Sequence, residues 1–499
     1  PQKTPGSVRL RGEAIAGIFL VSASMLFFEI TLTRLFSVTQ WYHFAFISVS
    51  VALLGFGASG TWLTLRPLEA GDLPEERNRP VLGRLAAIAS LFSLSILIAY
   101  LAINYVPFDS YRIVWEQRQL LYLALYYPAL IVPFFFAGLG IGLSLAAWPG
   151  RANAVYAANL TGSAAGSLAV LLLVPLLGGA GAVISASAVG MLAAIIFSVG
   201  TRQGSAYLRH VYALLLVALL ALLVHPPSLF ALRISPYKTL SISLHFPQAR
   251  LVFSRWNAFS RVDVVDSATI HSAPGLSLSF VGGLPKQLGL MVDGGNLSPI
   301  PCLQSLNDAL FLQYLPTALA YQLRPQARTL LIEPRGGLDL LTALHSGASS
   351  VVALESNPLI VQAVREQSSA SEGFGIGGAG QCGAAGYDDR QVTVVFEEVR
   401  SYLRGSREQF DVLLLCLADT YQPVISGAYS LSESYAYTIE AFLEYLKHLR
   451  AEGLLVVTRW VQSPPSEELR ACALLAEALE RAGAGDPSWQ VIAFRSWST

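Results

Sequence analysis

The stretch Thr329-Leu-Leu-Ile-Glu-Pro-Arg-Gly-Gly-Leu-Asp339 joins a short apolar run to a glycine turn and then to a helical pattern. This order of elements is typical of the start of a doubly wound α/β sheet. Downstream, apolar runs and helical segments alternate as far as residue 494, which predicts a parallel sheet with helices on both faces. The predicted strands are 329–333, 350–354, 391–395, 410–416, 453–458 and 489–494, and the predicted helices are 337–346, 357–367, 398–404, 434–450 and 465–482.

The first turn of this pattern predicts a nucleoside-type ligand. Gly336 and Gly337 would let a ligand approach the backbone of the turn. Glu355 ends the second predicted strand, 19 residues after Gly336. An acidic residue at that place can accept hydrogen bonds from ribose hydroxyls. We therefore take Gly336, Gly337 and Glu355 as candidate cofactor-binding residues.

Three regions are expected along the chain. Residues 250–300 contain alternating segments with turn signals, which predict a small β domain, and a helical stretch at 305–323 follows. Together with a linker these form a region at 227–325. The sheet domain occupies 326–499, and a helix bundle is expected at 1–226.

The amino-acid composition is the reason for expecting this helix bundle. Only 13% of the 499 residues are charged, against roughly 25% in soluble domains, and the mean hydropathy is +0.51. Of the 66 charged residues, 21 lie in residues 1–226. This excludes an ordinary soluble enzyme, because a helix needs about 20 mostly apolar residues to cross a bilayer and seven such stretches are present. They are 13–36, 44–65, 81–104, 120–147, 153–176, 180–200 and 206–225.

Several partners and cofactors are disfavoured. Lys+Arg and Asp+Glu are equal at 33 each, so we expect no nucleic-acid partner, and the lipid bilayer is the predicted one. A retinal protein is excluded because Lys3 is the only lysine before residue 227. The histidines that could hold a haem lie near span ends. The four cysteines lack CxxC spacing and nearby histidines, so no metal site is predicted.

Glu29 and Arg34 lie within the first predicted span. Ionisable residues at membrane depth are costly. They form either a polar site inside the bundle or an ion pair that fixes helix packing, and both interpretations stay open here.

The distribution of Lys and Arg among the short loops predicts the orientation. Basic residues gather at the N-terminus and in the loops after the second, fourth and sixth spans, whereas the opposite loops offer Arg112 and Arg118. The N-terminus is therefore expected in the cytoplasm. With seven spans, residues 227–499 would lie outside it, where one disulfide is possible.

Residues 255–460 resemble the spermidine synthase family, within the S-adenosylmethionine-dependent transferases. This resemblance implies a methyltransferase-like Rossmann domain. Some of the motifs resemble the membrane-bound bacterial branch of the family in particular. The matching segments are Arg255–Val264, Val292–Gly294, Tyr314–Leu319, Phe410–Thr420 and Ser430–Tyr435.

That branch also carries an N-terminal helix bundle. Its Glu–Arg motif is similar to Glu29 and Arg34, and its Tyr-Ala-Ala-Asp motif to Tyr156–Asn159. The resemblance implies a multi-pass protein of the bacterial inner membrane, whose cofactor, if it is active, would be S-adenosylmethionine or its decarboxylated form. The branch usually continues beyond the position of Thr499, so the chain is expected to be processed or partial.

The chain departs from the family at positions that face the ligand. Glu333 and Arg335 stand where the branch has glycines in the first turn, and side chains there would crowd a ligand. Glu398-Val399 stands where an acidic and a small residue contact adenine, which makes Glu398 a further cofactor-binding candidate.

The catalytic positions are also altered. Cys416 replaces the acidic residue that helps to deprotonate the attacking amine, which leaves Asp419 as the catalytic candidate. Asn159 replaces an Asp of the bundle motif and removes a charge.

Three functions are therefore compared. The first is a catalytically altered or inactive subunit that binds no cofactor and acts as a scaffold beside other subunits of a membrane complex. The second is an active aminopropyl- or methyltransferase, with Glu355 holding the ribose and Asp419 the acceptor. The third is a transporter-like bundle built around Glu29 and Arg34.

Overall fold

A computed structural model of the chain describes residues 12–40, 45–66, 78–109, 112–201, 206–303, 309–369, 386–417, 435–461, 464–465 and 467–499. The chain divides into two compact units. The first unit is Pro1–Ile234 with Trp256–Ser260, and the second is Ser235–Arg255 with Arg261–Thr499.

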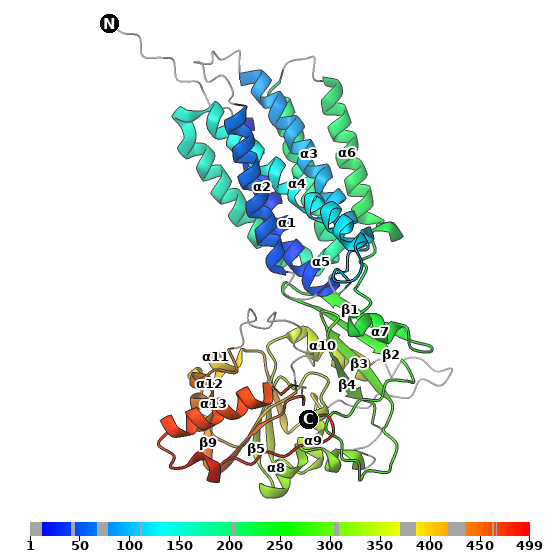
Figure 1. Cartoon of the computed structure of the whole chain (residues 1–499), viewed down its shortest axis with the longest axis vertical. Helices are drawn as coiled ribbons and strands as arrows, with labels where there is room; N and C mark the ends of the chain where they lie inside the picture. The colour runs from blue at the N-terminus through cyan, green and yellow to red at the C-terminus, as the bar shows by residue number, and fades with distance from the viewer. Residues whose placement is uncertain are drawn as a thin grey trace. The chain divides into compact units, whose positions relative to one another are not determined.

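Within the described residues of the first unit, six helices are long and apolar enough to cross a membrane (Figure 1). The predicted segments 153–176 and 180–200 are both found in one of them, which is why seven predicted spans become six helices. The helices are α1 (Gly12–Thr39), α2 (Ala45–Leu65), α3 (Asn78–Tyr105), α4 (Arg118–Ala147), α5 (Ala152–Val199) and α6 (Ala206–Val224).

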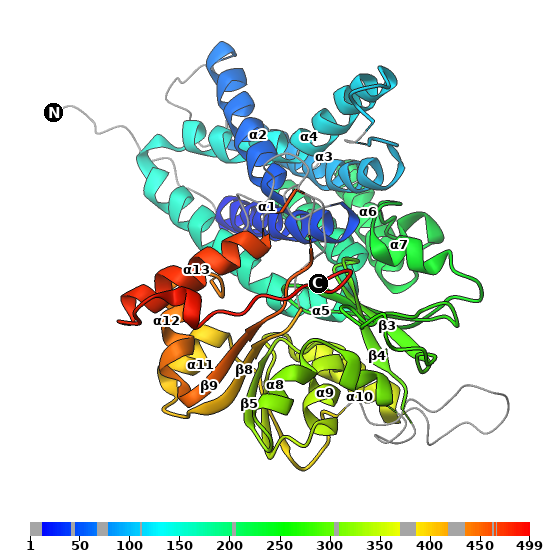
Figure 2. The same cartoon turned by 60° about the horizontal axis from the view of Figure 1, so that its bottom comes forward.

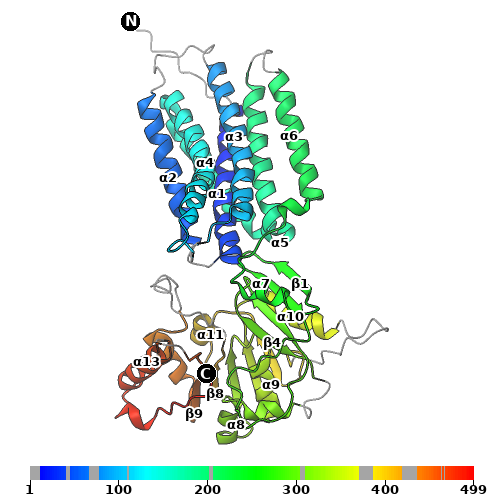
Figure 3. The same cartoon turned by 45° about the vertical axis from the view of Figure 1, so that its right-hand side comes forward.

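Helix α5 is bent back on itself at Gly178. At 48 residues a straight helix would be about 72 Å long, more than twice the ~30 Å hydrocarbon core of a bilayer. Gly178 has a φ of +67° and a ψ of −178°, which is not helical and suits glycine. The two arms, 152–177 and 179–199, run along the bundle in Figure 3.

The contacts of α5 with α1 show that its arms are antiparallel. Along the first arm of α5, higher residue numbers contact higher residue numbers of α1. Along the second arm, higher residue numbers of α5 contact lower residue numbers of α1. The pairs are Phe19 with Gly162, Ala23 with Gly166, Leu35 with Gly179, Ser24 with Ala186, and Gly17 with Phe197. The bundle therefore contains seven helical rods, in agreement with the seven predicted stretches, and the chain leaves it at the end opposite to that where α1 begins.

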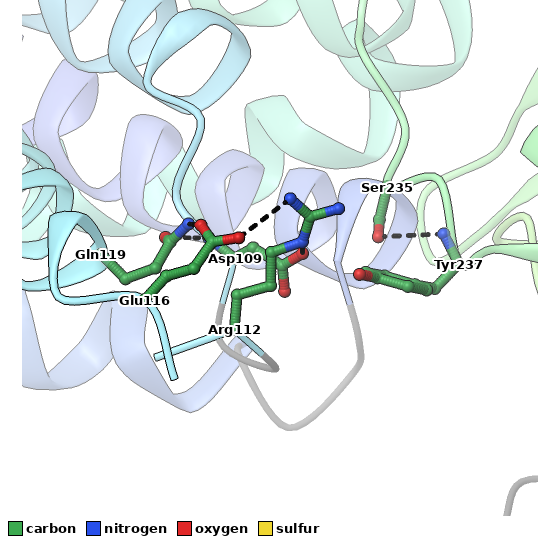
Figure 4. Close-up of polar contacts among 6 residues, drawn as sticks. All are labelled: Asp109, Arg112, Glu116, Gln119, Ser235 and Tyr237. Atoms are coloured by element: carbon green, nitrogen blue, oxygen red, sulfur yellow. Dashed lines mark hydrogen bonds and ion pairs between the residues drawn. The ribbon is translucent and has the colours of Figure 1, made fainter. Parts of the chain in front are cut away.

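Polar side chains organise the loop between α3 and α4. The guanidinium of Arg112 forms ion pairs with Asp109 at 3.4 Å and with Glu116 at 3.3 Å (Figure 4). Gln119 accepts a hydrogen bond from the backbone N–H of Asp109 at 2.9 Å. The positive charge of Arg112 is therefore compensated within its own loop. Figure 4 also shows Ser235 and Tyr237, the start of the second unit, where the Tyr237 N–H donates to the Ser235 hydroxyl at 3.4 Å.

The second unit begins with the small β domain that the sequence predicts. After the short helix α7 (Thr239–Leu244), four strands form one sheet in the order β1-β2-β3-β4, and β3 pairs antiparallel with both of its neighbours. The strands are β1 (Arg250–Trp256), β2 (Arg261–Asp266), β3 (Gln287–Val292) and β4 (Leu297–Pro301).

The predicted parallel sheet follows, with five of its six predicted strands. Its order is β7-β6-β5-β8-β9, and every neighbouring pair is parallel. The strands are β5 (Arg328–Ile332), β6 (Ser350–Leu354), β7 (Val392–Val395), β8 (Phe410–Leu415) and β9 (Leu449–Val457).

Helices cover both faces of this sheet (Figure 2). Side chains alternate along each strand, so Leu331 packs with α9 and α10 on one face, while Leu330 and Ile332 pack with α11, α12 and α13 on the other. The helices are α9 (Leu338–His345), α10 (Pro358–Ser369), α11 (Val399–Gly405), α12 (Ile439–Lys447) and α13 (Glu467–Arg481).

Two predicted elements differ in the structure. The helix at 305–323 is replaced, in its described part, by a 3-10 turn at Leu310–Tyr314 and a short helix α8 at Ala318–Leu323, because Pro316 interrupts the pattern. The strand at 489–494 is absent, since a 3-10 turn occupies Pro487–Trp489 and no regular structure follows. Alternation of apolar and polar residues indicates a segment that can form a strand. A strand also needs a neighbouring strand with which its backbone forms hydrogen bonds.

The contact between α1 and the first arm of α5 gives a testable prediction. A Cβ at Gly166 would collide with the backbone carbonyl of Ala23, so Gly166→Ala should destabilise the bundle by about 1–3 kcal/mol through overpacking. Gly57→Ala is the matched control, because a Cβ there meets no atom within 4 Å. Thermal unfolding midpoints in detergent test this, and equal midpoints for the two variants would contradict it.

Candidate functional site

A small cavity lies at the carboxyl ends of β5 and β8. The chain runs from β5 outward to β7 on one side and from β8 to β9 on the other, so this is the switch point of the sheet, where ligands bind in such folds. The cavity volume is about 50 Å³, room for a few water molecules. Its polar lining includes Thr317, Glu333, Arg335, Asp339 and Cys416.

The first turn has the backbone shape of a glycine turn but carries side chains. Glu333 has a φ of +56° and Arg335 a φ of +49°, and Gly337 has a φ of +92°. The left-handed region costs a residue with a Cβ roughly 1–2 kcal/mol. Glu333 and Arg335 are thus held in a backbone conformation that suits glycine.

Reciprocal hydrogen bonds hold this turn closed. The Arg335 N–H donates to Glu355 Oε2 at 3.2 Å, and the Ser356 N–H donates to Glu333 Oε1 at 3.1 Å. The Glu333 N–H donates to the carbonyl of Leu354 at 2.8 Å. The carboxylate of each loop therefore binds the backbone of the other, which ties the loops after β5 and β6 together.

A tyrosine supports the same turn from a third loop. Tyr387 is buried, and its hydroxyl donates to the carbonyl of Arg335 at 2.8 Å. Burial raises the pKa of Tyr387 well above its usual value, and Glu355 adds to that rise. The tyrosine therefore stays neutral and keeps its proton for this hydrogen bond.

Glu355 lies beneath the turn and is fully buried. Burial raises the pKa of Glu355 well above its ordinary value, and the neighbouring carboxyl of Glu333 raises it further through repulsion and a shared hydrogen bond, while Arg335 opposes the shift. Both effects favour the protonated form of the Glu355 carboxyl. It does not line the cavity, and its predicted contact with a ribose stays a prediction.

Both glycines of the turn, Gly336 and Gly337, have a structural role. The Gly336 N–H donates to Ser298 Oγ at 3.1 Å, and a Cβ at Gly336 would collide with the carbonyl of Pro299. Gly336 therefore packs the turn against β4. Gly337 is the N-cap of α9, and its N–H donates to the carbonyl of Pro334 at 3.0 Å. Their predicted role in admitting a cofactor stays a prediction.

Asp339 is a site residue that the sequence patterns did not reveal. The Thr317 hydroxyl donates to Asp339 Oδ1 at 3.1 Å, and the Cys416 thiol interacts with the same carboxyl. Burial raises the pKa of Asp339, and it raises the pKa of the Cys416 thiol even more clearly. Acidic residues are common in the first turn of a helix, so nothing in the sequence marks this one.

Two further candidates lie apart from the cavity or outside the described chain. Glu398 is exposed and caps α11, where its carboxylate accepts a hydrogen bond from the Arg400 N–H at 3.0 Å. Asp419 and the segment Ser430–Ser434 lie outside the described residues. The catalytic role of Asp419 therefore stays a prediction.

The candidate polar residues of the bundle, Glu29, Arg34 and Asn159, do not form one cluster among the described residues. The Ser22 hydroxyl donates to Asn159 Oδ1 at 2.7 Å, which joins α1 to the first arm of α5. Arg34 Nη1 donates to the carbonyl of Phe259 at 3.1 Å, so it binds the hairpin Trp256–Ser260. Among the described residues, Glu29 and Arg34 form no ion pair with each other.

Comparison with known proteins finds a low similarity to spermidine synthases. No family model matches the sequence, and neither does any curated protein. A crystal structure of spermidine synthase from Thermotoga maritima is 14% identical over 47% of this chain, with a TM-score of 0.30. A crystal structure of spermidine synthase in complex with the transition state analogue AdoDATO is 15% identical over 47% of this chain, with a TM-score of 0.29. The similarity covers 63% of each of those chains, and no conclusion about chemistry follows from it.

The buried carboxyl pair predicts a dependence of stability on pH. The pKa of Glu355 is higher in the folded than in the unfolded chain, so the stabilisation is complete below the unfolded value near 4.5 and is lost as the pH rises through the folded value. Glu355→Gln should flatten this decline, with a remaining slope from Asp339. Denaturant unfolding at a series of pH values measures it. The exposed Glu398→Gln is the control and should leave the slope unchanged; an unaltered slope in Glu355→Gln would contradict the raised pKa of Glu355.

Proposed function

We propose that this chain is a multi-pass membrane protein whose second unit keeps a spermidine synthase-like fold as a subunit or scaffold, without the transfer reaction. The observation that carries the proposal is the self-closed first turn. A ligand at such a turn would bind its backbone N–H groups. Here the N–H of Arg335 binds Glu355, that of Gly336 binds Ser298, and that of Gly337 binds Pro334.

The chemistry of the cavity supports the same proposal. A general base needs a pKa near the working pH and a free lone pair. The Cys416 thiol stands where the similar family has an acid, and burial beside Asp339 raises the pKa of that thiol. It therefore stays protonated and cannot accept a proton from an amine.

The size of the cavity points in the same direction. Sites for small molecules usually have volumes of about 300–1,000 Å³, whereas this cavity has about 50 Å³. A nucleoside would have to displace the side chains of Glu333 and Arg335 to enter.

The alternative is an active membrane-bound transferase, and one observation favours it. Asp339 is a half-buried carboxyl group that lines the cavity, and a group of that kind can orient an amine. The spermidine synthase solved with AdoDATO holds a transition state analogue. In this alternative the cofactor would be S-adenosylmethionine or its decarboxylated form, held by Gly336, Gly337, Glu355 and Glu398, with Asp419 acting on the acceptor.

Ligand binding separates the two functions. The full chain in detergent should give no binding heat with S-adenosylmethionine or its decarboxylated form at millimolar concentration. The double variant Glu333→Gly/Arg335→Gly removes both side chains and keeps the left-handed turn at lower strain, so it shows whether closure alone prevents binding. Micromolar binding by the unmodified chain in isothermal titration calorimetry would contradict the proposal.

We also propose that the chain lies in a bacterial inner membrane with its second unit on the outer, periplasmic face. Seven rods of alternating direction bring the chain out opposite to its N-terminal end. In the loop at that opposite end, the carboxylates of Asp109 and Glu116 compensate the positive charge of Arg112. In addition, Cys302 is disulfide-bonded, and disulfides persist mainly in oxidising compartments.

Reporter fusions test this orientation. Alkaline phosphatase fused after Thr499 should be active, because the enzyme needs an oxidising compartment to fold. The same reporter fused after Leu65, the end of α2, should be inactive. The opposite pattern would place the second unit in the cytoplasm and would restore the active transferase as the better proposal.

A thiol count on the same protein provides an independent check. Two of the four cysteines, Cys416 and Cys472, are free. The denatured, unreduced protein should therefore expose two thiols, and the reduced protein four. Four thiols before reduction would remove the disulfide from the argument.

A further inference from the structure

The C-terminal segment Ser496–Thr499 is attached to two separate parts of the second unit. The Trp497 indole Nε1 donates to the carbonyl of Leu276 at 3.1 Å, and the Gly275 N–H donates to Ser498 Oγ at 3.0 Å. On the other side, the Val461 N–H donates to the carbonyl of Ser498 at 2.9 Å. The segment therefore bridges the loop at Gly275 and the chain that follows β9.

Both attachment points adjoin the cavity of Asp339 and Cys416. Pro274 and Trp460, the residues before Gly275 and Val461, line that cavity, as does Pro316. Gly275 has a φ of +80°, and a Cβ there would be 2.8 Å from Pro316 and in collision with the Thr499 hydroxyl. The end of the chain is marked C in Figure 1, near the label of α9. The segment does not line the cavity itself, but it ties together the two chain segments that contribute Pro274 and Trp460 to the wall of the cavity.

We propose that Ser496–Thr499 is a strap that holds two wall segments of this cavity together, and that its release lets them part and opens the cavity to small molecules. The proposal does not depend on whether the second unit is a scaffold or a transferase, since either would have a cavity that the strap controls.

The strap is held by few interactions. The Trp497 side chain is 64% exposed, so its ring buries little apolar surface. The preceding residues 490–495 have no regular structure, and Ile492 and Phe494 among them are exposed. Segments with few buried contacts open at a lower free energy than the core does. The strap can therefore detach while the parallel sheet stays folded.

Cys416 is a natural reporter of that opening. Its side chain lines the cavity and is only 5% exposed. The other free cysteine of the described chain, Cys472, is exposed and would react first. In a Cys472→Ser background, the rate at which N-ethylmaleimide labels Cys416 measures how often the cavity is accessible.

The experiment uses the full chain in detergent. Trp497→Ala should speed the labelling of Cys416 by about tenfold, the effect expected from losing one hydrogen bond together with a ring contact. Ser498→Ala removes the acceptor of the Gly275 N–H and should speed labelling in the same direction. Trp489→Ala is the matched control, because Trp489 is 86% exposed and lies outside the strap, and its rate should equal that of the parent.

Local opening is distinguished from unfolding by a second measurement. The denaturant midpoint of the second unit should be the same for the parent and Trp497→Ala. Unchanged labelling in both strap variants would overturn the proposal, and so would faster labelling in proportion to a lower midpoint. Neither result depends on cofactor binding, so failure here is separate from failure of the proposed function.

Discussion

The exchange of hydrogen bonds between the loops after β5 and β6 is the constraint on which the candidate site depends. Glu333 binds the Ser356 amide while Glu355 binds the Arg335 amide, so neither loop can move without breaking a bond in the other. The exchange takes place with Glu355 fully buried, and burial together with the neighbouring Glu333 raises the pKa of the Glu355 carboxyl. The turn, the small cavity and the occupied amide groups all follow from this arrangement.

A comparable constraint organises the bundle, where the approach of two backbones matters more than side-chain chemistry. Both arms of α5 pack along α1, and at Gly162 and Gly166 the helices come so close that a Cβ would meet the backbone of α1. Such contacts between small residues are typical of helices packed in lipid. There the hydrophobic effect does not drive helices together, so they associate through close packing of their backbones. The Ser22–Asn159 hydrogen bond adds a polar link at the same interface.

The sequence predicted most elements because their periodicities are local. Apolar runs located the five strands of the parallel sheet and the seven rods, including the break at Gly178. The sequence could not show that segment 489–494 lacks a partner strand, since strand pairing depends on residues that are distant along the chain. Nor could it show that Glu333 and Arg335 adopt positive φ, because tertiary bonds alone hold residues with a Cβ in that region. Asp339 was missed because its burial comes from Thr317 and Cys416, which lie on other elements.

The energetics of the turn explain how residues with a Cβ are held in a backbone shape that suits glycine. Two residues with a Cβ in the left-handed region cost roughly 1–2 kcal/mol each. A hydrogen bond contributes about 0.5–1.5 kcal/mol, or about 1.5–3 kcal/mol where the acceptor is charged, and the turn has one to each carboxyl group. The side chain of Glu333 thus offsets the strain that it brings, by binding Ser356, and Arg335 offers its amide to Glu355. A turn that satisfies its own donors needs no ligand to be stable.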